Sequence, residues 1–248
     1  MGSSHARLRQ FDKAHHDVNH TTAPVAIRDA ASVLVLDRSG DEPRVLMGQR
    51  GKAAVFMPSK FVFPGGALDQ ADEGIAFLSE LPGQTARRLS AEPRPDANAS
   101  PTALAAAALR ELAEETGLLC GSAGPAPAQW AEYVEGGISP DPSGLIYFFR
   151  AITPPHANRR YDTRFFLLDT QLIHGDPHDF SRASDELSDI QWIGLAEARQ
   201  LDLPFITEVV LAEVQRLLRD AKSAPLAEPD GVPFFDNRGD KSRFIRID

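Results

Sequence analysis

The chain has 248 residues, enough for one compact domain with appendages, and its 42% of hydrophobic residues can fill a sizeable core. Lysine and arginine number 26 against 35 aspartates and glutamates, so the formal net charge of -9 repels polyanions and argues against a protein that coats nucleic acid. The single cysteine, Cys120, excludes an intramolecular disulfide and fits a reducing compartment. We expect its side chain to be small, buried and inert.

Residues 1–24 are predicted to form a flexible polar arm. The arm contains His5, His15, His16 and His20, but its mixed charge is more typical of a mobile segment than of a metal site. The chain has no apolar run near the ~20 residues that span a bilayer, and its start lacks the apolar core of a signal peptide. We therefore expect a cytoplasmic protein without membrane contact.

The next segments predict strands. Apolar stretches at 30–36 and 44–49 flank a turn rich in Asp, Ser, Gly and Pro, a pattern that predicts a β-hairpin. The sequence "FVFPGGALD" predicts a short aromatic strand that ends at adjacent glycines, where the backbone can approach a ligand closely. Residues 73–100 contain several prolines and mixed charges, so we expect a surface insertion with few packing contacts and one short helix near 75–80.

A helix is predicted to begin after Ser100, because a serine N-cap precedes a proline and an alanine-rich run, and to end at Gly117. Three further strands are expected at 145–152, 163–169 and 189–194. Apolar residues recur at helical spacing between 206 and 219 and predict an amphipathic helix across the sheet. From 223 to the end we expect a tail that contains one aromatic pair, Phe234 and Phe235.

The end of the first helix carries an unusual cluster of acids. Glu111, Glu114 and Glu115 stand at positions i, i+3 and i+4, so their carboxylates share one helix face and repel each other by about 0.2 to 0.5 kcal/mol per pair. The helix macrodipole also disfavours negative charge at this end. A hard divalent cation requires several oxygen ligands at short range and would resolve the repulsion. The alternative is a solvated acidic face.

The residues around the cluster resemble a known signature. The sequence "RELAEETGL" at 110–118 is similar to the second half of the Nudix hydrolase signature, and Gly66, five further residues and Asp72 are similar to its first half. In most of that family seven residues separate the two halves, whereas 37 lie between Asp72 and Arg110. About thirty residues are therefore inserted between halves that are both complete.

The insertion points to one branch of the family. Together with "VLMGQRGKAAVFMPSKFVFPGGALDQAD" and "RRYDTRFFLL", it resembles the peroxisomal coenzyme A diphosphatase branch, whose members have an insertion inside the signature. The resemblance implies an α/β/α sandwich with a mixed central sheet, in a domain at 25–222. It also implies divalent-metal-dependent hydrolysis of a diphosphate bond in a nucleoside-diphosphate-linked compound, with coenzyme A or an acyl-CoA as the first candidate. The alternatives are a non-catalytic nucleotide sensor and a nucleoside triphosphate pyrophosphatase.

The resemblance also implies roles for single residues. Mg²⁺ or Mn²⁺ is expected to bind Glu111, Glu114, Glu115 and the carbonyl group of Gly66. Glu111 is a ligand or the general base, and Arg110 holds a glutamate in place. Asp72 occupies the position of the usual glutamate, with Asp69 as the alternative, and Glu186 or its neighbour Asp185 is expected to supply a further acid; we favour Glu186.

Phosphate groups need cationic partners, and we favour Arg50 and Arg164. The other cations considered are Lys52, Arg159 and Arg160. We expect Phe56, Met57 and Phe61 to pack in the core, with the lining of an apolar or adenine pocket as the alternative. The expected partner is a small-molecule diphosphate, with no nucleic acid and no membrane, and a homodimer is left open.

Overall fold

The structure is a computed structural model that describes residues 25–52, 57–221, 224–239 and 241–248. The predicted arm at 1–24 and Phe56 lie outside the described residues. Within the described residues, nine strands form one sheet in the order β10-β2-β1-β8-β7-β11-β12, with β3 paired to β2 and β4 paired to β1. These strands are β1 (Ile27–Asp37), β2 (Arg44–Arg50), β3 (Phe61–Val62), β4 (Gly65–Ala67), β7 (Ile146–Ile152), β8 (Arg160–Asp169), β10 (Leu187–Gly194), β11 (Val232–Asp236) and β12 (Arg243–Ile247).

The sheet is mixed, as the sequence predicted. Strands β1 and β8 run parallel over ten residue pairs, from Ile27 opposite Arg160 to Leu36 opposite Asp169, whereas β1 and β2 form the predicted antiparallel hairpin. A small separate sheet has the order β6-β5-β9. Its strands are β5 (Leu119–Ala123), β6 (Ile138–Pro140) and β9 (Ile173–His174).

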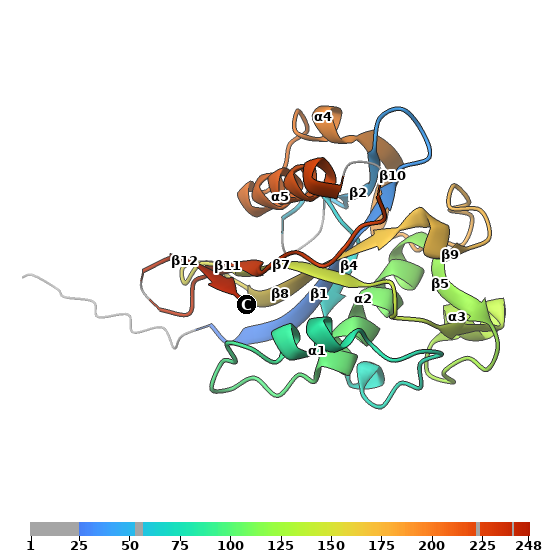
Figure 1. Ribbon diagram of the computed structural model, residues 1–248, viewed down its shortest axis with the longest axis horizontal. Coiled ribbons are helices and arrows are strands. Elements are labelled where there is room, and N and C mark those ends of the chain that lie inside the picture. Colours follow the sequence, from blue (N-terminus) through green and yellow to red (C-terminus); the bar gives the residue numbers. More distant parts are fainter. Residues whose placement is uncertain (1–24, 53–56, 222–223, 240) are drawn as a thin grey trace, which may run out of the picture.

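Helices cover both faces of the large sheet (Figure 1). Helix α2 (Pro101–Thr116) lies on one face and α5 (Phe205–Ala221) on the other, and each face has its own hydrophobic core. The predicted α/β/α architecture is therefore confirmed. The shorter helices are α1 (Gly83–Leu89), α3 (Ala131–Gly136), α4 (Leu195–Ala198) and the 3₁₀ turns η1 (Gln70–Asp72) and η2 (Thr170–Leu172). No helix in the described part of the chain is both long and apolar enough to cross a bilayer.

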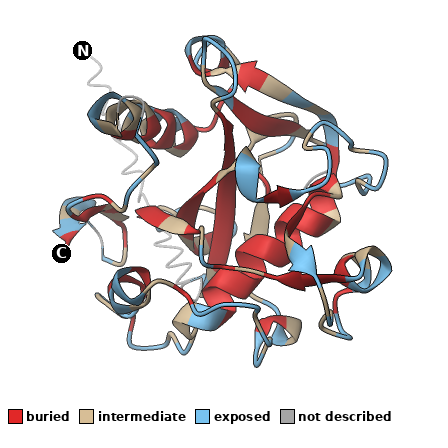
Figure 2. Cartoon of the chain, turned by 45° about the vertical axis from the view of Figure 1, so that its right-hand side comes forward, coloured by how far each residue is buried: buried red, intermediate tan, exposed pale blue. Residues whose placement is uncertain are grey.

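Helix α2 is packed unusually closely against the sheet. Its alanine-rich first half is almost entirely buried, and Figure 2 shows buried residues along nearly its whole length. The predicted ends are confirmed, because the Ser100 hydroxyl accepts a hydrogen bond from the Ala103 amide at 3.1 Å and Gly117 adopts a left-handed conformation with φ of 76°. This packing fixes where the acids of the last two turns lie.

The predicted insertion differs from expectation in two ways. Its helix is α1 at 83–89, after Pro82, and no helix forms at 75–80, a short stretch between Gly74 and Pro82. The segment is also firmly anchored: Arg88 and Arg94 are 4% and 3% exposed. The expectation of few packing contacts was wrong, because prolines and charges predict a surface position only when the charges lack buried partners.

The residues after 223 also differ from the predicted tail. Strand β11 adds to the sheet parallel to β7, with Phe234 opposite Arg150 and Phe235 opposite Ala151, and β12 continues the sheet. Phe234 is fully buried, and the Arg150 guanidinium lies 4.2 Å from its ring centre. The interpretation as an irregular tail was wrong, because the pairing partner of this short strand lies far away in the chain.

Candidate active site

One arginine organises the acidic end of α2. The Arg110 guanidinium donates from Nε to Asp72 Oδ1 at 2.7 Å and from Nη2 to Asp72 Oδ2 at 3.0 Å. Its Nη1 group donates to Glu111 Oε1 at 3.0 Å and to Glu114 Oε2 at 2.9 Å. Asp69 instead caps η1 by accepting from the Ala71 amide at 2.9 Å. Asp72, rather than Asp69, is therefore the acid that orients Arg110.

Glu115 is the most buried of the three glutamates, at 1% exposure. Its Oε2 atom accepts a hydrogen bond from the Gly65 amide at 2.8 Å, whereas Oε1 is buried without a hydrogen-bond partner. Burial and the nearby Glu111 carboxylate raise the pKa of Glu115 well above its ordinary value. A buried carboxylate oxygen without a partner costs about 1 to 3 kcal/mol or more, and a cation bound at this atom would offset that cost.

Glu111 lies against the glycines of β4. A Cβ atom placed on Gly66 would lie 2.3 Å from Glu111 Oε1, so only glycine allows this approach. Burial raises the pKa of Glu111 to about 7, with a further increase from Glu114 and an opposing effect from Arg110. The pKa of the half-exposed Glu114 is raised by burial and lowered by Arg110.

A second acid and a cation approach from the other side of the site. Arg50, at the end of β2, donates from Nη2 to Glu186 Oε1 at 3.2 Å, and its Nε group is buried without a partner. Glu186 is close enough to raise the pKa values of Glu111 and Glu115. Asp185 and Glu186 both border the same cavity, so the structure brings both candidate acids to the site, and the preference for Glu186 stays a prediction.

The site opens into one cavity of about 790 Å³, a size typical of sites that enclose a nucleotide-sized ligand. Glu115 is not in its lining but contacts it through the Gly65 amide. Glu111, Glu114 and Arg50 line one part of the cavity. Aromatic side chains from distant segments line another part, among them Phe165, Phe205 and Phe235. The arrangement combines anionic oxygen atoms for a cation, a guanidinium for an anion and an apolar surface.

Comparison with known proteins bears on what this cavity does. No protein-family model matches the chain. It is 30% identical over 188 residues to a Caenorhabditis elegans protein named "Putative nudix hydrolase 7", a match that covers 67% of this chain and 51% of that protein. The chain thus spans about half the length of this curated relative. The crystal structure of a NUDIX hydrolase from Alicyclobacillus acidocaldarius has 28% identity and a TM-score of 0.56, covering 82% of this chain and 99% of that one.

The curated relative and the crystal structure both support assignment of the chain to the Nudix hydrolase superfamily. In this Nudix fold, the residues similar to the two halves of the signature come together despite the segment between them: η1 supplies Asp72, β4 supplies Gly66 and α2 supplies the glutamates. The contact between Arg110 and Asp72 joins the two halves directly.

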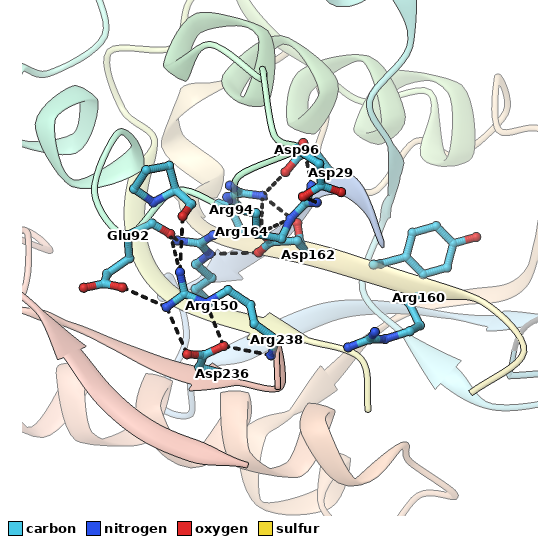
Figure 3. A network of polar contacts seen from close by, with 12 residues as sticks. Asp29, Glu92, Arg94, Asp96, Arg150, Arg160, Asp162, Arg164, Asp236 and Arg238 are labelled. Carbon is cyan, nitrogen blue, oxygen red and sulfur yellow. Dashed lines mark hydrogen bonds and ion pairs between the residues drawn. The ribbon is translucent and has the colours of Figure 1, made fainter. Parts of the chain in front are cut away.

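Not every predicted phosphate-binding residue lies in the cavity. Arg164 is 3% exposed and belongs to a buried ionic network, with its Nη1 group 2.6 Å from Asp29 Oδ1 and 3.3 Å from Asp162 Oδ2 (Figure 3). The prediction that Arg164 holds phosphate was wrong. Arg160 is also buried, and it donates to the backbone carbonyls of Thr153 and Asn237.

The strand period explains this error. On β8, residues 160, 162 and 164 point to one face of the sheet, whereas Tyr161, Thr163 and Phe165 point to the other and line the cavity. The alternation in "RYDTRFF" was therefore a sequence signal for the cavity-lining residues. Among the other candidates, Arg159 and Met57 line the cavity, Phe61 packs against the core beneath α5, and Lys52 is exposed.

The carboxylate oxygens are the donors that a hard cation prefers, although the acids do not form a complete set of converging ligands. No three Asp, Glu, His or Cys side chains converge closely enough to hold a metal ion in the part of the chain that the structure describes. Arg110 Nη1 contacts both Glu111 and Glu114 and occupies part of the space between their carboxylates. The Oε1 atom of Glu115 has no hydrogen-bond partner, and burial, with a further contribution from the neighbouring acids, raises the pKa values of Glu111 and Glu115.

Cys120 takes no part in this chemistry. Its thiol is 2% exposed and donates to the Asp141 carbonyl at 3.3 Å, and burial raises its pKa to about 12. The expected inert, buried side chain is confirmed, because a thiol with this pKa is not ionised at neutral pH.

Proposed function

We propose that this protein is a divalent-metal-dependent hydrolase that cleaves a diphosphate bond in a nucleoside-diphosphate-linked compound. The observation that carries the proposal is the excess of buried carboxylate beside a nucleotide-sized cavity: Glu111, Glu114 and Arg50 line the cavity, and Glu115 accepts from the amide of Gly65, which also lines it. Glu115 Oε1 has no partner, and the pKa values of Glu111, Glu114 and Glu115 are all raised. Groups that are costly to leave unpaired, in a cavity, are candidates for function rather than for stability.

The cation that suits these oxygen ligands is Mg²⁺ or Mn²⁺. Glu111, Glu114 and Glu115 would hold it, with the Gly66 carbonyl and Glu186 as the further ligands that the family resemblance suggests. When bound, such an ion neutralises charge on the diphosphate and lowers the pKa of water. The partnerless Glu115 oxygen supports this assignment, since a cation would remove the cost of its burial.

The protein's own side chains prepare the site in two ways. Asp72 accepts hydrogen bonds from one edge of the Arg110 guanidinium, and Nη1 donates to Glu111 and Glu114. Arg110 therefore positions the carboxylates of these two glutamates. Glu111 has a pKa of about 7, close to the value that suits a proton acceptor at neutral pH. Glu111 therefore serves as a ligand, as the general base, or as both in turn.

The anionic substrate requires a cation from the protein as well. Arg50 lines the cavity beside Glu186, and its Nε group lacks a partner. A guanidinium can donate two parallel hydrogen bonds to two oxygens of one phosphate group. We therefore retain Arg50 as the phosphate-binding residue and no longer propose Arg164.

Coenzyme A or an acyl-CoA is the first substrate candidate, because the segments around 44–72 and 159–168 resemble the coenzyme A diphosphatase branch. A nucleoside triphosphate pyrophosphatase and a non-catalytic nucleotide sensor are the alternatives. The cavity volume of about 790 Å³ favours a nucleotide with a substantial attached group over a small phosphate.

A substrate panel tests the proposal. Coenzyme A derivatives, ADP-ribose, dinucleoside polyphosphates and nucleoside triphosphates are incubated with the protein and Mg²⁺ or Mn²⁺, and products are separated by chromatography. We expect cleavage between two phosphates of at least one compound, with Glu115→Gln as the inactive control. Tight binding of a panel member without turnover under all conditions would instead establish the sensor.

A further inference from the structure

The cavity extends well beyond the carboxylates. Its lining crosses five neighbouring strands, from β4 through β1, β8 and β7 to β11. Adjacent strands lie about 4.8 Å apart, so four steps between strands correspond to a path of about 20 Å across the sheet. A diphosphate alone is much shorter than this path. The far end of the cavity must therefore face another part of any ligand held at the carboxylates.

The far end is apolar and is built by two segments that are distant in sequence. Phe205 begins α5 and Phe235 lies on β11, with their rings edge to face and the centroids 6.4 Å apart. Ile206 lies beside them in the cavity lining. Phe205 is 69% exposed, so it contributes little to the core and presents hydrocarbon surface to the cavity.

The strand that carries Phe235 is held from behind by ionic contacts. The neighbouring Asp236 is 1% exposed and accepts hydrogen bonds from Arg238 and Arg243. Arg238 also donates from Nη2 to Glu92 Oε2 at 2.8 Å and from Nη1 to the Pro93 carbonyl at 3.2 Å (Figure 3). The segment at 73–100 thus contacts the β11–β12 hairpin and fixes the position of the cavity wall without lining the cavity itself.

We propose that Phe205 and Phe235 bind an apolar arm of the substrate, attached to the diphosphate on the side away from the nucleoside. Arg238 is a positioning residue that acts through Asp236. The proposal rests on the proposed function, because the arm is placed by its diphosphate at the carboxylate end. The wall presents phenylalanine and isoleucine side chains, so an alkyl chain is the chemistry that it selects.

Two adenosine diphosphate esters test the wall. One carries a methyl arm and the other an n-octyl arm on the terminal phosphate, both below the concentration at which the octyl compound forms micelles. We expect wild-type kcat/KM to be at least tenfold higher for the octyl ester, because each buried methylene contributes favourably to binding. Phe205→Ala and Phe235→Ala should each reduce this ratio at least fivefold.

Further variants distinguish the loss of the apolar wall formed by Phe205 and Phe235 from a general loss of folding. Phe235→Leu retains an apolar side chain and should keep most of the preference if the alanine variant folds poorly. Leu78→Ala removes another exposed apolar side chain, outside the cavity lining, and should leave the ratio unchanged. Arg238→Ala should raise KM for the octyl ester alone without changing kcat, and Arg238→Lys should restore part of the effect.

Binding measurements distinguish failure of the wall from failure of the proposed function. Calorimetry with Glu115→Gln measures affinity for both esters without turnover. If wild type cleaves neither ester but the octyl ester binds at least tenfold more tightly, the wall stands and the proposed function fails. Equal affinity for the two esters, or an unchanged ratio in Phe235→Ala, overturns the wall. Analytical ultracentrifugation gives a further test. If both alanine variants convert a wild-type dimer to monomers without changing the ratio, the phenylalanines belong to an interface between copies, and the proposed wall is overturned.

Discussion

The ionic network around Asp162 and the carboxylate cluster at the end of α2 are both buried, and they differ in how far their charges are balanced. In the ionic network, the fully buried Asp162 accepts from Arg150 Nε at 2.8 Å and from Arg94 Nε at 2.9 Å, and although burial acts in the opposite direction, these bonds keep its pKa below the ordinary value. At the end of α2, burial raises the pKa values of Glu111 and Glu115. Burial alone therefore does not distinguish a site. A carboxylate saturated by guanidiniums holds the fold, whereas a carboxylate with a spare oxygen is available to a ligand.

The largest expected effect on stability comes from the network. Asp162→Asn leaves Arg94, Arg150 and Arg164 buried beside an uncharged side chain, so we expect the free energy of unfolding to fall by about 3 to 5 kcal/mol. Urea unfolding followed by circular dichroism measures the loss. A change below about 1 kcal/mol would show that the network is not what holds these strands together.

The matched change in the carboxylate cluster should do the opposite. Glu115→Gln removes a buried negative charge of which one oxygen, Oε1, lacks a hydrogen-bond partner. The metal-free protein should therefore be as stable as wild type or more stable, while turnover falls at least about 100-fold. Glu114→Gln should lower turnover similarly. Steady-state kinetics at saturating Mg²⁺ and urea unfolding are measured on the same samples. Near wild-type activity in either variant would contradict the metal assignment.

The raised pKa of Glu111 predicts a pH dependence of stability without metal. The ordinary value is 4.5 and the folded value is about 7, so the folded protein binds more protons between these pH values than the unfolded chain. Stability of the EDTA-treated protein should therefore fall as pH rises from about 4.5 to 7, by up to about 3 kcal/mol from this group. Unfolding at pH 5 and pH 7.5 tests this, and Glu111→Gln should remove the share of the difference that comes from Glu111, while Glu114 and Glu115, whose pKa values are also raised, keep theirs. A wild-type slope of opposite sign would refute it.

The smallest effect on stability should come from the exposed edge of the network. The Arg238 and Glu92 side chains pair at 2.8 Å, but Glu92 is 46% exposed, so Glu92→Gln should lower the free energy of unfolding by less than about 1 kcal/mol. Thermal unfolding of this variant and of Asp162→Asn compares the stability lost at the exposed edge of the network with that lost at its buried centre. An equally large loss of stability in both variants would mean that the exposure of an ion pair does not determine how much it stabilises the network.

The sequence predicted the parts of this molecule whose causes are local. The cap at Ser100, the alanine run and Gly117 determine α2, and the spacing of its glutamates places them on one face. The β11–β12 hairpin was missed because β11 joins the rest of the sheet only through β7, which lies more than eighty residues earlier, with Arg150 opposite Phe234. The role of Arg164 was missed because a strand residue faces either a core network or a cavity, and only the sheet decides which.

The central claim is that the carboxylates of α2 hold a divalent cation, and a crystal soaked in Mn²⁺ tests it most directly. We expect an anomalous difference peak from an ion that is coordinated by Glu115 Oε1, Glu111 and Glu114. Glu186 should lie within direct or one-water reach of this ion. No peak at this position in a fully soaked crystal, or a peak bonded only to other acids, would contradict it.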